Sequence, residues 1–297
     1  MKFFGLLNIN KPVGMTSRDV VNVVQRLVRK KCKVGHAGTL DPLATGVLVL
    51  CLGPATRLIE YVQRMPKSYH GKFLLGSDSP TEDIEGEIAQ LLNPPIPSLE
   101  QLESAAGKLT GEIQQRPPDF SALKIKGRRA YDLARAGKPV ELAPRGVKVH
   151  DLSIVRYNYP ELSLDIRCGS GTYIRSLGRD LAELVGTAAV MSELNRTAIG
   201  EFGIEDAIAL NSLTEDRIAA ALKPALLAVA KMPQIEIATF EQEKIIDGCC
   251  IQRDSLSKPR DGEYAAVTEM GDLLAILVDR GQGRLAPVRV FNTHQPK

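Results

Sequence analysis

Residues 36–52 read HAGTLDPLATGVLVLCL, and the rest of the sequence can be organised around this stretch. Its second part, residues 47–52, is a continuous apolar run with the length of a buried strand. Its first part is rich in residues that interrupt regular structure, and a proline directly after Asp41 biases that residue towards an extended backbone. Loops fixed by buried strands often carry catalytic side chains. A plain Asp-Pro turn is the alternative interpretation of these residues by themselves.

The flanking sequence predicts a mixture of helices and strands. Residues 16–28 begin with two N-cap candidates and continue with a helical apolar period. Residues 99–108 and 174–184 also have helical patterns, whereas residues 161–168 alternate apolar and polar side chains as a half-buried strand does. Strands and helices alternate without a strict βαβ rhythm. We therefore expect an α+β fold with a mixed β-sheet core flanked by helices.

Two segments differ from this pattern. Residues 116–145 open with Arg-Pro-Pro, are rich in Lys and Arg and have no long apolar face, so we expect a protruding loop and helix. Apolar runs separated by glycines in residues 238–297 predict a small β domain. The stretch 219–234, rich in Ala, Lys and Pro, is the expected boundary region. The expected domains are thus residues 1–230 and residues 238–297.

The charge distribution is uneven although the net charge is only +3. Residues 1–68 contain 11 Lys and Arg against 3 Asp and Glu, and residues 116–150 contain 9 against 3. Between them, residues 69–115 contain 2 against 8. Two basic blocks in a nearly neutral protein favour a polyanionic partner laid across part of the surface. Ordinary solvated basic faces are the alternative.

Composition and missing motifs narrow the function further. The chain has 297 residues, of which 44% are hydrophobic and 25% charged, as in ordinary globular proteins. It contains no apolar run of the roughly 18 residues that span a bilayer, and its N-terminal apolar patch is too short for a signal-peptide core, so we expect a cytoplasmic protein. Five scattered cysteines and four scattered histidines lack the spacing of a metal site. With no P-loop or dinucleotide motif either, we expect neither a metal nor a cofactor.

The string HAGTLDPLATGVL at residues 36–48 closely resembles the motif around the catalytic aspartate of TruB-type tRNA pseudouridine synthases. Other motifs of that family follow in the same order along residues 5–205. They are NINKPVGMTS (8–17), GPATRLIEYV (53–62), KSYHGKFLLGSDSPTEDIEG (67–86), RPPDFSALKIKGRRAYDLAR (116–135), CGSGTYIRSLGRDLAELVG (168–186) and LNRTAIGEF (194–202). Residues 238–297 resemble a PUA-type RNA-binding domain more loosely.

The resemblance implies a pseudouridine synthase fold with a thumb insertion at about residues 116–145, which grips the T arm of tRNA. It implies isomerisation of uridine to pseudouridine at position 55 of the T loop, with base flipping and without a cofactor. The guide-RNA-dependent branch of the family lacks the thumb, so we expect a stand-alone and monomeric enzyme. A tRNA-binding folding chaperone whose catalysis is secondary shares the whole scaffold, and this alternative stays open.

The resemblance also assigns roles to residues. It implies that Asp41 is the nucleophile, that Arg175 is its cationic partner and that Tyr69 stacks on the uracil and helps to remove the C5 proton. The ribose and the base both remain candidates for the first attack by Asp41. Five further residues match substrate-binding positions: His36, Tyr173, Leu194, Lys11 and Asp83. Four cations of the thumb match positions facing the RNA backbone: Lys124, Lys126, Arg128 and Arg129. For Lys11, a structural role is the alternative.

Two positions depart from the family pattern. Asn10 stands where the family usually has aspartate, and Ser170 stands where many relatives have lysine. Neither position is the catalytic aspartate. The second departure removes one potential phosphate contact beside the motif at residues 168–186.

Overall fold

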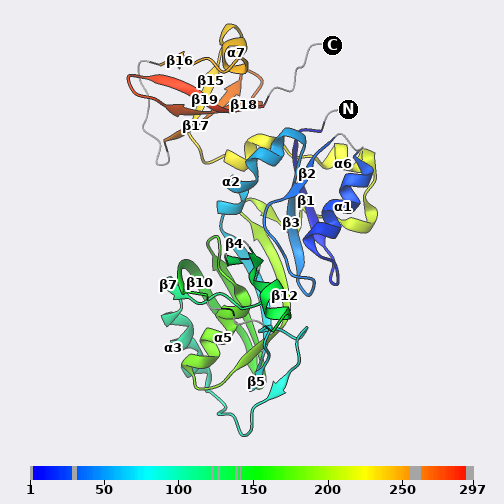
Figure 1. The fold of residues 1–297 in the computed structure, drawn as a ribbon, viewed down its shortest axis with the longest axis vertical. Coiled ribbons are helices and arrows are strands. Elements are labelled where there is room, and N and C mark those ends of the chain that lie inside the picture. Colours follow the sequence, from blue (N-terminus) through cyan, green and yellow to red (C-terminus); the bar gives the residue numbers. More distant parts are fainter. Residues whose placement is uncertain are drawn as a thin grey trace.

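The structure, a computed structural model, describes residues 3–28, 32–121, 123–125, 128–137, 140, 142–253 and 262–291. Its largest element is a ten-stranded mixed sheet that runs through most of the elongated molecule (Figure 1). The main path of the sheet is, in spatial order, β14 (Ile208–Ala209), β1 (Gly5–Lys11), β3 (Thr45–Leu52), β12 (Ala189–Ile199), β4 (Lys67–Leu75), β11 (Glu161–Cys168), β10 (Arg145–Asn158) and β7 (Gly111–Gln115). Two short strands extend it, β2 (Val34–His36) on β3 and β13 (Phe202–Gly203) on β12. The expected α+β fold with a mixed sheet is confirmed.

Helices pack against both halves of this sheet. Helix α1 (Ser17–Leu27), with a capping box from Thr16 and Asp19, packs its valines against β1 and β3. Helices α3 (Leu99–Lys108) and α5 (Ile174–Leu184) pack against the half made by β4, β11 and β10. Strand β3 is buried along almost its whole length, which explains its continuous apolar run. All three helices were predicted from their sequence periods.

Shorter elements connect the strands. The ribbon β5–β6, Ser77–Asp78 with Ala89–Gln90, precedes α3. The remaining helical segments of this part are η1 (Gly53–Leu58), α2 (Ile59–Arg64), η2 (Leu210–Ser212), α6 (Glu215–Ala221) and η3 (Ala225–Val229).

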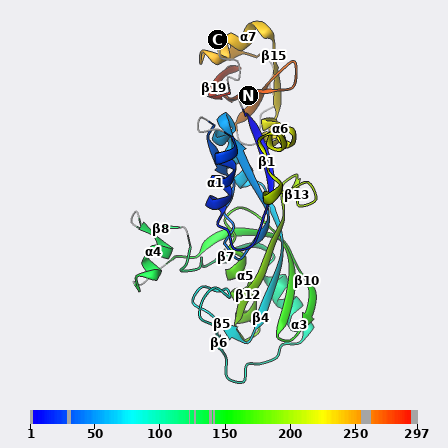
Figure 2. The same ribbon diagram turned by 90° about the vertical axis from the view of Figure 1, so that its right-hand side faces the viewer.

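The thumb segment stands out from the body of the sheet (Figure 2). Its described residues form a two-stranded ribbon, β8 (Lys124–Ile125) with β9 (Arg128–Arg129), followed by α4 (Ala130–Arg135). The segment leaves the sheet at the end of β7 and returns at the start of β10, where Gln115 and Arg145 are directly paired. The expected protruding loop and helix is therefore confirmed.

A second sheet of five strands forms the C-terminal part (Figure 1). Its spatial order is β15 (Gln234–Ile237), β17 (Glu263–Thr268), β18 (Leu273–Asp279), β19 (Arg284–Val290) and β16 (Ile251–Gln252). The sheet begins four residues before the expected start at 238, because β15 pairs in parallel with β17. One helix, α7 (Thr239–Ile246), rich in helix-forming Glu, Gln and Lys, follows β15 and was not predicted from the sequence.

The second sheet is docked on the first part through a mixed apolar and charged contact. The rings of Phe4 and Phe291 stack with centroids 5.6 Å apart. Tyr61 donates a hydrogen bond to Glu263 (3.1 Å), and Arg289 forms an ion pair with Glu60. The two sheets therefore share one apolar cluster at their junction.

The described ranges contain neither a helix that could span a membrane nor a cluster of metal-binding side chains. Among the helices in this part of the chain, none has both the length and the apolar character needed to cross a membrane. Within the same residues, no cluster of three or more His, Cys, Asp or Glu side chains is arranged to hold a metal ion.

Candidate active site

The loop between β2 and β3, residues 37–44, lies at the centre of the large sheet. Strand β12 runs parallel to β3 here and places Arg196 beside Gly46. Gly46 has a φ of +100°, and a Cβ at this position would lie 2.3 Å from the carbonyl oxygen of Arg196. Only glycine accommodates both this backbone conformation and this close approach. The turn thus carries the chain into β3 while Asp41 stays in the loop.

Two buried side chains hold the backbone of this loop. Arg196, which is 1% exposed, donates to the carbonyl oxygens of Val47 (2.7 Å) and Gly38 (3.0 Å). The hydroxyl of Ser17, at the start of α1, accepts from the N–H of Leu40 (2.8 Å) and donates to its carbonyl oxygen (3.1 Å). These bonds satisfy loop groups that have no partner in the sheet ladder.

Lys11 belongs to the same scaffold. Its side chain is fully buried, and its ammonium donates to the carbonyl oxygens of Pro12 (2.9 Å), Met15 (2.6 Å) and Pro42 (3.3 Å). Burial is the main cause that lowers the pKa of Lys11 to about 8. These contacts favour the structural alternative for Lys11, next to Asp41, and its expected substrate contact stays a prediction.

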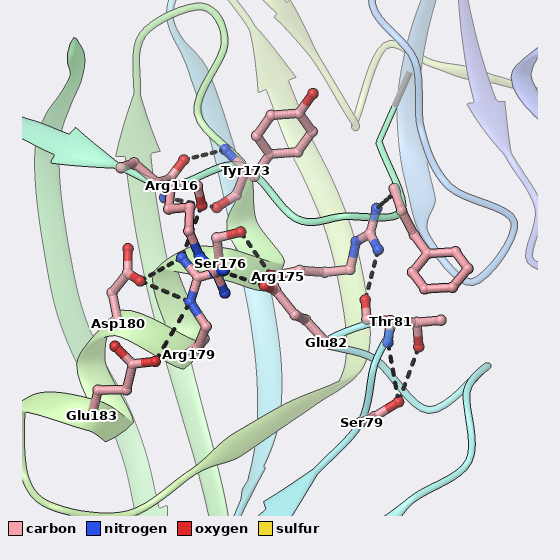
Figure 3. A network of polar contacts seen from close by, with 12 residues as sticks. Ser79, Thr81, Glu82, Arg116, Tyr173, Arg175, Ser176, Arg179, Asp180 and Glu183 are labelled. Carbon is pink, nitrogen blue, oxygen red and sulfur yellow. Dashed lines mark hydrogen bonds and ion pairs between the residues drawn. The ribbon is translucent and has the colours of Figure 1, made fainter. Parts of the chain in front are cut away.

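Asp41 and Arg175 meet across the site. Arg175 Nε lies 3.1 Å from Asp41 Oδ2, and the side chain of Asp41 is 38% exposed whereas that of Arg175 is 8% exposed. The other guanidinium nitrogens donate to the carbonyl oxygens of Thr81 (2.7 Å) and Phe120 (3.1 Å), and Nη1 lies 3.4 Å from Asp83 Oδ2. Figure 3 shows Arg175 extending from α5 towards Thr81. A rigidly held cation thus faces an accessible carboxylate.

Asp83 is the second carboxylate next to Arg175. Its side chain is 3% exposed and accepts hydrogen bonds from the Thr81 hydroxyl (2.6 Å) and the Glu85 N–H (3.1 Å). With these partners and Arg175 around it, the carboxylate is enclosed by protein. The structure thus places Asp83 as a group that positions Arg175, and the expected substrate contact of Asp83 stays a prediction.

A second ionic network, which the sequence analysis missed, lies one helical turn further along α5 (Figure 3). Arg179 pairs with Glu82 and Asp180 and donates to the carbonyl oxygen of Arg116 (2.8 Å). Ser176 donates to the other oxygen of Glu82 (2.7 Å). Burial is the main cause that raises the pKa of Glu82, and Arg179 opposes this shift. The spacing of Arg175 and Arg179, four residues apart on one helix, was the available signal.

Tyr69 and Leu194 lie on neighbouring strands of the sheet, β4 and β12. Tyr69 is 9% exposed and Leu194 is 7% exposed, and both belong to the apolar cluster that contains Leu40 and Ala44 of the loop at residues 37–44. Burial raises the pKa of Tyr69, and the nearby Asp41 adds to this effect. Tyr69 is therefore a neutral phenol next to the loop.

His36 ends β2 directly before the loop. Burial and the charges of Arg18 and Arg196 lower the pKa of His36, so the imidazole is neutral near pH 7. Its Nδ1 is buried and lacks a hydrogen-bond partner among the described residues.

Tyr173 immediately precedes α5, two residues before Arg175 (Figure 3). It is half-buried, and its backbone and ring contact Gln115 and Arg145. The structure thus brings Asp41, Tyr69, Tyr173 and Arg175 into one region from three separate motifs, because Tyr173 and Arg175 share the motif at residues 168–186.

The four thumb cations are placed only in part. Lys124 lies on β8, and Arg128 and Arg129 lie on β9, but their side chains are outside the described structure. Lys126 lies outside the described residues altogether. Their expected contacts with the RNA backbone therefore stay predictions.

Comparison with known proteins agrees with this geometry. Residues 25–174 match the model of the TruB family pseudouridylate synthases (N-terminal domain). A protein of Dehalococcoides mccartyi (strain ATCC BAA-2100 / JCM 16839 / KCTC 5957 / BAV1) named tRNA pseudouridine synthase B is 36% identical over 99% of this chain and 98% of its own length. A protein of the same name from Arthrobacter sp. (strain FB24) is 40% identical over 97% and 96%, respectively.

Among solved structures, a chain in the crystal structure of a Cbf5-Nop10-Gar1 complex superimposes with a TM-score of 0.72 at 25% identity, covering 99% of this chain and 85% of that chain. The fold of this chain is therefore that of a known class of enzymes, the pseudouridine synthases. The chain belongs to the TruB family of these enzymes.

Proposed function

We propose that the protein converts uridine to pseudouridine in tRNA, at position 55 of the T loop, with Asp41 as the nucleophile. The observation that carries the proposal is the ion pair between Asp41 and Arg175, in which a buried guanidinium faces an accessible carboxylate at 3.1 Å. A tRNA substrate is supported by relatives named tRNA pseudouridine synthase B that align over nearly the whole chain.

The reaction is an isomerisation that the residues at the site can carry by themselves. The bond between C1′ and N1 breaks, the uracil turns, and C1′ joins C5, while C5 loses a proton and N1 gains one. Asp41 supplies the nucleophilic carboxylate, and Arg175, whose position on α5 is fixed, balances the negative charge of this carboxylate. No electron acceptor is required, because substrate and product are isomers. Tyr69 offers a neutral phenol to stack on the ring and to take part in the C5 proton transfer.

Access to the target uridine requires base flipping, at a cost of a few kcal/mol. The basic thumb and the basic N-terminal residues would hold the phosphates of the T arm on either side of the loop. We assign His36 to the flipped conformation of the T loop and Leu194 to the wall of the uracil pocket. The five-stranded C-terminal sheet would act as a PUA-like RNA-binding part.

An unmodified T-arm stem-loop tests this function, with EDTA present and pseudouridine formation as the readout. We expect wild-type protein to convert the RNA and Asp41→Asn to be slower by at least about 10,000-fold, with RNA binding preserved. Asp151→Asn, which changes an exposed carboxylate on β10, is the matched control and should keep full activity.

Two results would contradict the proposal. Equal activity in wild type and Asp41→Asn would remove Asp41 from the nucleophile role. Binding by both proteins without conversion by either would support a tRNA-folding chaperone instead.

A further inference from the structure

We infer that Gln115 and Arg145 are positioning residues that hold Tyr173 in place, and that they connect both roots of the thumb to the uracil pocket. The two residues form a directly opposed pair on β7 and β10, and the thumb is the chain between them. The inference deepens the proposed function and rests on it, because Tyr173 meets uracil only if that function is correct.

Gln115 holds the backbone of Tyr173. Its Oε1 accepts from the Tyr173 N–H (2.9 Å), and its Nε2 donates to the Tyr173 carbonyl oxygen (3.1 Å). Gln115 is 1% exposed, so water does not compete for these bonds. Tyr173 is the N-cap residue of α5, where the helix provides no partner for the backbone N–H. One buried amide therefore contacts both backbone polar groups of Tyr173, whose carbonyl oxygen also accepts from the Leu177 N–H (3.0 Å).

Arg145 holds the ring of Tyr173. The guanidinium carbon lies 5.0 Å from the ring centroid, within the range of a cation–π contact. The same guanidinium donates through Nη2 to the carbonyl oxygen of Gly171, in the turn before α5. A guanidinium stacked on one face of the ring leaves the opposite face and the edge for a bound base. Arg145 thus fixes the ring and the turn that carries it.

In addition to Gln115 and Arg145, a third residue near the base of the thumb contacts the N-terminal end of α5. Phe120, near the N-terminal root of the thumb, offers its carbonyl oxygen to Arg175. The thumb segment therefore contacts residues directly before α5 and Arg175 in its first turn, which is the partner of Asp41. RNA held by the thumb would act on the backbone that orients Tyr173 and Arg175. Loss of the clamp should then slow the conversion of bound RNA more than it weakens binding.

Four methionine variants of the full-length protein test this separation. Gln115→Met and Arg145→Met keep side-chain length but remove the contacts with Tyr173, and Gln114→Met and Arg156→Met make the same changes at exposed positions nearby. With enzyme in saturating excess over a T-arm stem-loop, we expect both clamp variants to convert RNA at least about tenfold more slowly. Their Kd for the RNA should change by less than about threefold, and Arg145→Lys should regain part of the rate. Both control variants should match the wild type.

A double-mutant cycle with Tyr173→Ala separates positioning from general damage to the fold. If Arg145 acts through Tyr173, adding Arg145→Met to Tyr173→Ala should have little further effect. The double variant should convert RNA at a rate within about threefold of that of Tyr173→Ala alone. Additive losses, or a rise in Kd as large as the loss of rate, would overturn the inference.

Hydrogen exchange in the free protein tests the clamp without any RNA. We expect the segment around Tyr173 to exchange faster in Gln115→Met than in wild type and in Gln114→Met. Unchanged exchange would overturn the clamp while leaving the proposed function intact. Failure of wild-type protein to convert the RNA would instead refute the proposed function, and the exchange rates would still decide whether Gln115 holds Tyr173.

Discussion

Two buried arginines that contact the Asp41 loop have different partners. Arg196, on β12, donates to the backbone carbonyl oxygens of Val47, Gly38 and Thr39. Arg175, on α5, lies between the carboxylates of Asp41 and Asp83. Both arginines therefore donate to backbone carbonyl oxygens, those of Thr81 and Phe120 in the case of Arg175, but only Arg175 also forms ion pairs with carboxylates among its described contacts.

The difference suggests that Arg196 supports the backbone conformation of the loop, whereas Arg175 balances the charge of carboxylates at the site. Carbonyl dipoles satisfy the donors of Arg196 but do not cancel its charge, which contributes to lowering the pKa of His36 and of Lys67, both shifted mainly by burial. The charge of Arg175 is balanced locally by two carboxylates. Changes at Arg196 should therefore act mainly on folding, and changes at Arg175 mainly on the reaction.

The largest effect is expected at Arg175. Arg175→Met should reduce the single-turnover rate on a T-arm stem-loop by about 1,000-fold, because Asp41 loses its fixed cationic partner. Arg175→Lys should recover only part of the rate, since an ammonium cannot reproduce the fork of donors. A rate within about tenfold of wild type in the methionine variant would show that the pair is not part of the chemistry.

The next effect, at Arg196, should be on stability. Arg196→Met leaves the carbonyl oxygens of Val47 and Gly38 without their donor in a buried region, and we expect the free energy of unfolding in urea to fall by about 3 kcal/mol. The exposed Arg156→Met should change it by less than about 0.5 kcal/mol. An equally small change for Arg196→Met would remove the distinction between the two arginines.

A smaller effect is expected from cations that lie outside both regions. Charge reversal at Arg128 and Arg129 should weaken binding of the T-arm stem-loop by about 10- to 100-fold at low salt and reduce the salt dependence of Kd. The rate at saturating enzyme should stay within about threefold of wild type. If that rate collapsed while Kd was unchanged, the thumb cations would have to act in the reaction and not in binding.

The smallest effect concerns pH and the uncancelled charge of Arg196. Burial and the charges of Arg18 and Arg196 lower the pKa of His36 in the folded protein below its value of about 6.5 in the unfolded chain. Between these two values the unfolded chain binds more protons, so the free energy of unfolding falls as the pH falls through this window. His36→Gln should flatten the acid side of the profile, by less than about 1.4 kcal/mol per pH unit. Parallel wild-type and variant profiles between pH 7.5 and 5.5, measured by urea unfolding, would contradict this assignment.

Much of the fold could be predicted from local patterns. The apolar run at 47–52 became β3, and the helical periods at 99–108 and 174–184 became α3 and α5. These elements follow from hydrophobic period and capping, which are properties of adjacent residues. The start of the second sheet was misplaced, because β15 is defined by its pairing with β17 and not by its own four residues.

The sequence by itself determined the family and indicated the residues that we propose for the chemistry, because Asp41, Tyr69 and Arg175 each stand in a long and specific motif. Only the tertiary structure decided which groups hold them. Lys11, Arg196 and Gln115 act on backbone groups of distant segments, and every residue offers the same backbone groups, so the sequence contains no signal for these partners. Those contacts exist only once the sheet has set the register of strands more than a hundred residues apart.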